Sequence, residues 1–175
     1  MKSGGKGKRM SLIETERLTM REILPSDAPF VLALLNEPSF IKNIGDRNVG
    51  DLKSAELYIR DRVLASYKEH GFGMYLLALK GDPKTAIGLC GLVKRPSLDY
   101  PDIGYALFPD YWGQGYAREA ASAVLNYGRK QLKLPVIVGI TNPDNQASGR
   151  VLEAIGLTFQ KMVTLDGGII NRLYG

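Results

Sequence analysis

The segment from residue 103 to residue 132 constrains the fold of this chain most. Residues 103–108 read IGYALF, which is typical of a β-strand, and residues 115–132 place apolar side chains at helical spacing. Gly113 and Gly115 lie in the turn between the two, where small residues let the backbone bend tightly. A strand that turns directly into a long amphipathic helix predicts a sheet with this helix packed on its face.

The remaining periodicities predict further strands and helices on both sides of this segment. Helical spacing follows candidate N-caps at Ser26-Asp27, Asp51 and Asn145, and these helices end near Glu37, Gly71 and Gly156. Strand patterns occupy residues 16–23, 73–79, 86–93, 136–141, 159–165 and 169–173. The expected order is β α α β β β α β α β β. We therefore predict an α/β (α+β) fold, with a central, mixed but mostly antiparallel twisted sheet flanked by helices.

Size and composition fit one domain. The chain has 175 residues, of which 45 % are hydrophobic, and we expect residues 11–175 to form a single domain. No apolar stretch approaches the roughly 20 residues of a transmembrane helix, and no secretory signal is recognisable, so we expect a cytoplasmic protein without membrane partners. Cys90 is the only cysteine, which excludes an internal disulfide and a thiolate metal site. We expect no metal.

The positive charge is concentrated at the start of the chain. The formal net charge is +5, and Lys2, Lys6, Lys8 and Arg9 account for +4 of it, which leaves +1 for the remaining residues. A nearly neutral domain is not typical of nucleic-acid binding, so no nucleic-acid partner is expected. We interpret residues 1–10 as a flexible basic tail, either a non-native extension or a native arm.

The glycine turn at residues 113–117 has two interpretations. The small residues Gly113, Gly115 and Ala117 leave backbone N–H groups open at the positive end of the following helix, which suits a pyrophosphate. Alternatively, the glycines serve only a tight connection between strand and helix. The sequence matches neither a Walker loop nor the Gly-x-Gly-x-x-Gly fingerprint, which argues against ATP and NAD.

A second pattern lies at residues 141–157, TNPDNQASGRVLEAIGL. Asn145 is placed to cap the helix that begins at Gln146, with Ser148 at its third position. The Asn145 amide could equally bind amide groups of an extended ligand.

Together these segments resemble the Gcn5-related N-acetyltransferase (GNAT) superfamily. Residues 112–117 (WGQGYA) are similar to its pyrophosphate motif, and Asn145 to Ser148 with Gly156-Leu157 are similar to its Asn-x-x-Ser helix. Residues 13–21 (IETERLTMR) resemble the opening of the branch that contains the ribosomal-protein alanine N-acetyltransferases (RimJ/RimL-like). The resemblance covers residues 11–174 and implies acetyl-CoA as co-substrate. It assigns cofactor binding to Leu107, Trp112, Gly113, Gln114, Gly115, Tyr116, Ala117, Arg118, Asn142, Asn145 and Ser148.

The resemblance also implies direct attack of an amine on the thioester, with two departures from the family pattern. Trp112 replaces the usual Arg or Gln, so the backbone amides of the turn are the main phosphate ligands. Leu152 stands where many members carry a tyrosine acid, which leaves Ser148 as the candidate acid. Asp102 is the candidate base, acting through water, although it could be a solvated acid at a strand start. Cys90 is expected in the core, and His70 at a helix end.

The acceptor is not encoded in a readable motif. The resemblance places acceptor binding at residues 36–52, the second helix and the final hairpin. A protein N-terminus is favoured over a small amine such as a polyamine, antibiotic or amino-acid derivative, because an α-amine has a pKa of about 8 against about 10.4 for lysine. A non-catalytic acyl-CoA-binding domain is the alternative from another class. Both a monomer and a homodimer are compatible with the sequence.

Overall fold

The computed structural model describes residues 11–175, so the predicted basic tail lies outside the described residues. The helices are α1 (Ala28–Leu35), α2 (Pro38–Asn43), α3 (Leu52–Tyr58), α4 (Ala65–His70), α5 (Tyr116–Lys130) and α6 (Gln146–Ala154). The strands are β1 (Ile13–Glu14), β2 (Leu18–Glu22), β3 (Met74–Leu79), β4 (Asp82–Val93), β5 (Asp102–Leu107), β6 (Val138–Thr141), β7 (Phe159–Thr164) and β8 (Ile170–Tyr174). A π-helical segment, η2 (Ile59–Leu64), joins α3 to α4, and short 3₁₀ turns lie at η1 (Pro25–Asp27), η3 (Pro109–Tyr111) and η4 (Asp166–Gly168).

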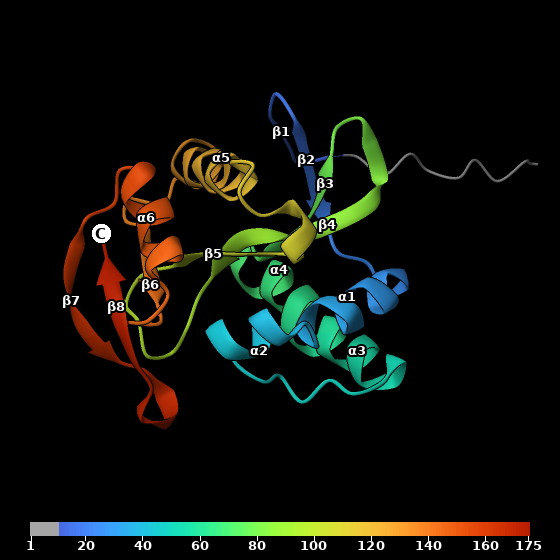
Figure 1. Ribbon diagram of the computed structural model, residues 1–175, viewed down its shortest axis with the longest axis horizontal. Helices are drawn as coiled ribbons and strands as arrows, with labels where there is room; N and C mark the ends of the chain where they lie inside the picture. Colours follow the sequence, from blue (N-terminus) through green and yellow to red (C-terminus); the bar gives the residue numbers. More distant parts are fainter. Residues whose placement is uncertain (1–10) are drawn as a thin grey trace, which may run out of the picture.

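The described strands form one eight-stranded sheet in the order β1-β2-β3-β4-β5-β6-β8-β7. Neighbouring strands are antiparallel except β5 and β6, which are parallel. This mixed, mostly antiparallel sheet confirms the predicted fold class, including the meander of β3, β4 and β5. In Figure 1, α5 lies above β5, and α1 to α4 lie below β4 and β5.

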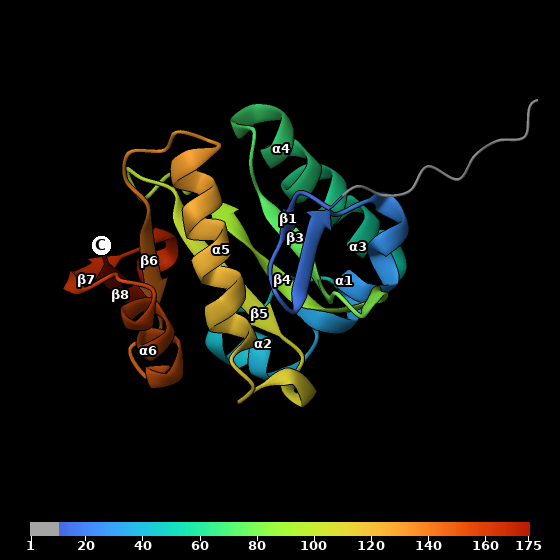
Figure 2. The ribbon, with the colours of Figure 1, turned by 90° about the horizontal axis from the view of Figure 1, so that it is seen from above.

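Two hydrophobic clusters lie on the two faces of the sheet. Alternating residues of β3 separate them: Tyr75 and Leu77 pack toward α5, whereas Leu76 and Ala78 pack toward α1 and α3. This period-two pattern is what a strand buried on both faces requires. Figure 2 shows α5 lying along the sheet on the face opposite α3 and α4.

Local capping signals explain where several helices begin and end. Asp51 Oδ1 accepts the backbone N–H of Ser54 at 2.8 Å, and Gly71 ends α4 in a left-handed conformation with φ 76°. Asp27 begins α1 as predicted, but its carboxylate binds Leu24 N and forms a two-pronged contact with Arg21. The start of α1 is therefore fixed by the strand before it.

The prediction was incomplete in three places. The expected loop between the first two helices contains α2, because Pro38 can start a helix at its first position. Residues 13 and 14 form the additional short strand β1, which is stabilised by pairing with β2. The strand predicted from residue 86 begins at Asp82, with register shifts opposite Ala78 that accommodate the tight turn.

Candidate active site

The candidate site is centred on a gap between β5 and β6. Their pairing consists of Asp102 with Val138 and Ile103 with Gly139, and beyond these pairs the strands separate. Phe108 donates its N–H to Ile87 O in β4, at 3.0 Å. Since successive residues of a strand point to alternate sides, the backbone groups of Leu107 face the gap. An extended molecule with amide groups could hydrogen-bond to this exposed strand edge.

The Leu107 carbonyl already has one side-chain partner. The indole N–H of Trp112 donates to Leu107 O at 3.0 Å, while the Trp112 side chain itself is 53 % exposed. This hydrogen bond thus links the end of β5 to the turn that follows it. The N–H of Leu107 and the second lone pair of its carbonyl oxygen remain for a ligand.

The glycine turn presents open backbone amides at the end of the gap. Gly113 and Gly115 both have positive φ, 72° and 81°, which L-residues adopt only at a cost. Glu119 N donates the first helical hydrogen bond of α5, to Gly115 O, so the amides of Tyr116, Ala117 and Arg118 precede it. A Cβ at Gly113 would meet no described atom within 4 Å. This cradle suits a phosphate group.

The start of α6 combines the predicted cap with a hydroxyl pair. Asn145 Oδ1 accepts the N–H of Ser148 at 3.2 Å, which confirms the cap, and Asn142 Oδ1 accepts the N–H of Asp144 at 2.9 Å. Half-buried Ser148 lies with its Oγ 2.7 Å from the hydroxyl of Tyr105. Burial raises the pKa of Tyr105, so this phenol stays protonated at neutral pH.

The structure thereby identifies two residues that the sequence analysis missed, Tyr105 and Thr141. Tyr105 belongs to β5, and Thr141 would lie opposite it if the pairing of β5 and β6 continued. The Thr141 hydroxyl is buried, and it has no hydrogen-bond partner within the described residues. Such an orphan group is costly unless a ligand satisfies it.

The candidate base, Asp102, is a buried ion-pair partner. Its side chain is 1 % exposed, and Oδ1 accepts Arg95 Nε at 2.9 Å. Burial raises the pKa of Asp102 to about 6, against the opposing attraction of Arg95. The carboxylate is therefore ionised at neutral pH, but its side chain is almost completely shielded from bulk solvent.

Cys90 and His70 take the positions expected for residues without a catalytic role. Cys90 is fully buried in β4, and burial raises the pKa of its thiol. His70 is the last residue of α4 and stacks on Phe72 at 5.6 Å between ring centres.

The comparison with protein families agrees with this geometry. The family model described as "Acetyltransferase (GNAT) domain" matches residues 17–158. The chain belongs to the GNAT family.

Proteins named as acetyltransferases resemble it over most of their length. The uncharacterized N-acetyltransferase YoaA of Bacillus subtilis is 30 % identical over 151 residues, covering 86 % of this chain and 83 % of YoaA. The crystal structure of an acetyltransferase from Agrobacterium tumefaciens superposes with a TM-score of 0.78 at 26 % identity, covering 99 % and 98 % of the two chains. RimL, a ribosomal L7/L12 alpha-N-protein acetyltransferase in complex with coenzyme A, has the same fold, with a TM-score of 0.79 at 18 % identity and coverage of 94 % and 96 %.

This GNAT protein is an acetyl-CoA-dependent acyltransferase that acetylates an amine. Three features fit the co-substrate: the open gap between β5 and β6, the orphan hydroxyl of Thr141 and the glycine cradle. Within residues 11–175, no group of three or more His, Cys, Asp or Glu side chains is placed to hold a metal. None of the described helices is both long and apolar enough to cross a membrane.

Proposed function

We propose that this GNAT enzyme acetylates the α-amino group at the N-terminus of a protein in the cytoplasm. The observation that carries the proposal is the burial of Asp102 beside Arg95, which leaves the candidate base without direct access to an acceptor amine. A water molecule must then relay the proton. An indirect base of this kind suits an acceptor that is already partly neutral.

The pKa values of amines quantify this argument. With a pKa of about 8, roughly a quarter of α-amino groups are neutral at pH 7.5, whereas a lysine side chain with a pKa of about 10.4 is neutral in only about 0.1 % of molecules. The likeness in fold to RimL, named as an alpha-N-protein acetyltransferase, is in line with the same acceptor class.

The residues of the gap and turn would hold acetyl-CoA, which supplies an activated acetyl thioester. In this proposal the amides of residues 113–118 bind the pyrophosphate, with Arg118 adding positive charge. The N–H of Leu107 and the side chain of Thr141 bind the amide-containing arm of the cofactor. The side chains of Asn142 and Asn145 border the same arm from the start of α6, in addition to their local hydrogen bonds.

The hydroxyl of Ser148 would donate a hydrogen bond to the departing thiolate, which would take its final proton from water. The Tyr105 hydroxyl donates to the backbone carbonyl of Ser148 at 2.9 Å, and its oxygen lies 2.7 Å from Ser148 Oγ, so Tyr105 would hold the Ser148 hydroxyl in place. Burial raises the pKa of Tyr105, so this phenol stays neutral and acts through its hydrogen bonds, not by giving up its proton. A thiolate with a pKa near 8.5 is a good leaving group, so this help is modest.

The proposal is tested by thiol release from acetyl-CoA with matched peptides. Peptides with free Ala, Ser, Thr or Met N-termini are compared with the same peptides after N-terminal blocking, and with a panel of small amines. Release that requires the free N-terminus supports the proposal. Release from blocked peptides that contain lysine, or from small amines alone, would overturn it.

A further inference from the structure

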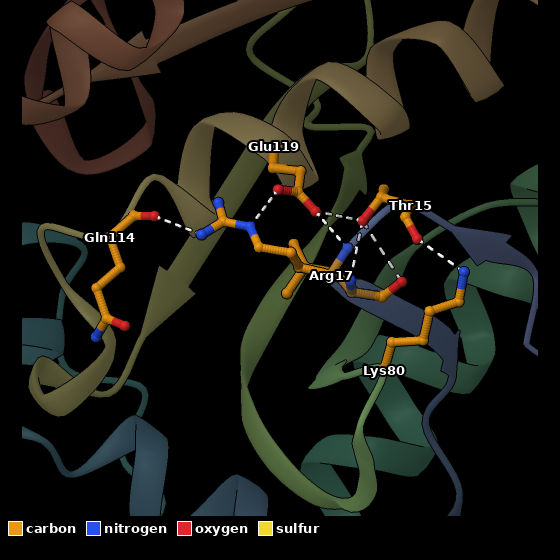
Figure 3. A network of polar contacts seen from close by, with 6 residues as sticks. Thr15, Arg17, Lys80, Gln114 and Glu119 are labelled. Carbon is orange, nitrogen blue, oxygen red and sulfur yellow. Dashed lines mark hydrogen bonds and ion pairs between the residues drawn. The ribbon is translucent and has the colours of Figure 1, made fainter.

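Arg17 links the start of the chain to the glycine turn. It lies between β1 and β2, and its guanidinium donates Nη1 to Gln114 O at 2.9 Å and lies 4.4 Å from the centre of the Tyr116 ring. A Cβ at Gly115 would come within 3.3 Å of Nη2. Figure 3 shows the Arg17 side chain reaching from the N-terminal hairpin to the turn.

Glu119, in the first turn of α5, completes this contact from the helix. Its Oε1 accepts Arg17 Nε at 2.7 Å, and its Oε2 accepts the Thr15 hydroxyl at 2.5 Å and the backbone N–H of Arg17 at 3.1 Å. Lys80 in turn donates Nζ to Thr15 O at 3.0 Å (Figure 3). We call Thr15, Arg17, Gln114 and Glu119 the turn clamp.

The bond to Gln114 O fixes the orientation of one peptide group of the cradle. In a trans peptide the C=O and the following N–H point in opposite directions. Because Arg17 holds the carbonyl of Gln114 on its own side, the N–H of Gly115 is turned to the other side. The clamp thus presets an amide of the proposed phosphate site.

The clamp also balances charge beside that site. A carboxylate in the first turn of a helix would repel a pyrophosphate bound at the same end. Glu119 is paired with Arg17, whose side chain remains 42 % exposed. Partial burial works to raise the pKa of Glu119, but the hydrogen bonds from Thr15 and Arg17 outweigh it and lower the pKa, so the pair stays ionised.

We propose that Arg17 and Glu119 are positioning residues for acetyl-CoA, which shape the phosphate-binding turn through the Gln114 carbonyl. This inference rests on the proposed placement of the pyrophosphate at residues 113–118. It predicts a defect specific to the phosphate-bearing part of the cofactor.

The experiment compares acetyl-CoA with S-acetylpantetheine, which carries the same thioester but no phosphate. Dissociation constants are measured by calorimetry for the first and by NMR titration for the second. Arg17→Ala should raise the Kd of acetyl-CoA about tenfold, in line with the loss of charge-assisted hydrogen bonds, and leave that of S-acetylpantetheine within about twofold. Arg17→Lys should have an intermediate effect. Arg60→Ala removes an arginine from an ion pair of equal length, 2.7 Å to Asp61, and should change neither.

The double variant Arg17→Ala/Glu119→Gln gives a second, independent readout. Because the two residues act as one unit, its Kd for acetyl-CoA should be no higher than that of Arg17→Ala. The inference would be overturned if the Kd of the double variant rose by the product of the factors for the two single substitutions. It would also be overturned if the variants raised the Kd of acetyl-CoA and of S-acetylpantetheine equally. If the unmodified protein bound both cofactors equally well, the phosphate turn itself would be wrong, which is a different failure.

Discussion

Replacing Asp102 by asparagine tests the electrostatics of the site most directly. The ordinary pKa of this carboxyl is 3.8, and burial raises it to about 6 in the folded protein. Between these values the folded state binds a proton that the unfolded state has already lost. The contribution of this group to stability is therefore fully present below pH 3.8 and is lost as the pH rises through about 6.

The magnitude follows from the difference between the two pKa values. At 1.36 kcal/mol per pKa unit, the loss amounts to about 3 kcal/mol. The amide of the Asp102→Asn variant cannot titrate. The unfolding free energy of the wild type minus that of the variant should thus fall by about 3 kcal/mol between pH 3.5 and pH 7.

Urea denaturation at a series of pH values measures this difference. Asp51→Asn is the control with the opposite sign, because hydrogen bonds from Ser54 lower the pKa of Asp51, whose contribution is lost as the pH falls below its ordinary range. Parallel stability curves for wild type and Asp102→Asn would refute the raised pKa. In the same variant, loss of a rising limb of kcat/KM near pH 6 would identify Asp102 as the base, and an unchanged profile would leave only the ion pair.

Four further substitutions probe the cofactor site. Gly115→Glu should abolish acetyl-CoA binding in calorimetry, since it forces an L-residue to φ 81° and adds a carboxylate at the turn; unchanged affinity would exclude the turn from the site. Asn145→Ala should cost about 1 kcal/mol of cap stability, and the deficit in Tm should widen with acetyl-CoA present; an equal deficit would leave only the cap. Thr141→Val removes a hydroxyl that has no partner among the described residues. It should therefore stabilise the ligand-free protein by about 1 kcal/mol in urea denaturation and weaken acetyl-CoA binding. A loss of stability would contradict this prediction. Tyr105→Phe should lower kcat for thiol release by no more than about tenfold without changing KM for acetyl-CoA, because it loosens the Ser148 hydroxyl; an unchanged kcat would reduce the bond to Ser148 to a structural contact.

The sequence predicted those features that are encoded locally. The caps at Asp51 and Asn145 and the glycine ends of α4 and α6 each depend on residues within one helical turn, so their signals are readable. The fold class followed from periodicity and from the short turns between β3, β4 and β5. The short helix α2 was missed because its six residues are too few to show a hydrophobic period.

The contacts that define the site could not be predicted, because they join distant segments. Tyr105 and Ser148 are 43 residues apart in the chain, and the backbone N–H of Arg17 and the carboxylate of Glu119 are 102 apart. From the sequence, Trp112 was seen only as a replacement for the usual Arg or Gln of the phosphate motif. In the structure its indole N–H donates to the carbonyl of Leu107. Only the packing of the strands reveals that the hydroxyl of Thr141 lacks a partner among the described residues.

The short pairing between β5 and β6 divides the described molecule into two lobes. One lobe comprises β1 to β5 with α1 to α4, the other comprises β6 to β8 with α6, and α5 packs against both. Within the sheet, two residue pairs join the lobes. In the proposed placement, a cofactor along the open part of this seam would connect the two lobes where backbone hydrogen bonds between them are missing. The affinity for acetyl-CoA and the stability of the contact between the lobes would then be linked, so that a substitution that loosens the seam would also weaken binding, even at a residue that touches no ligand.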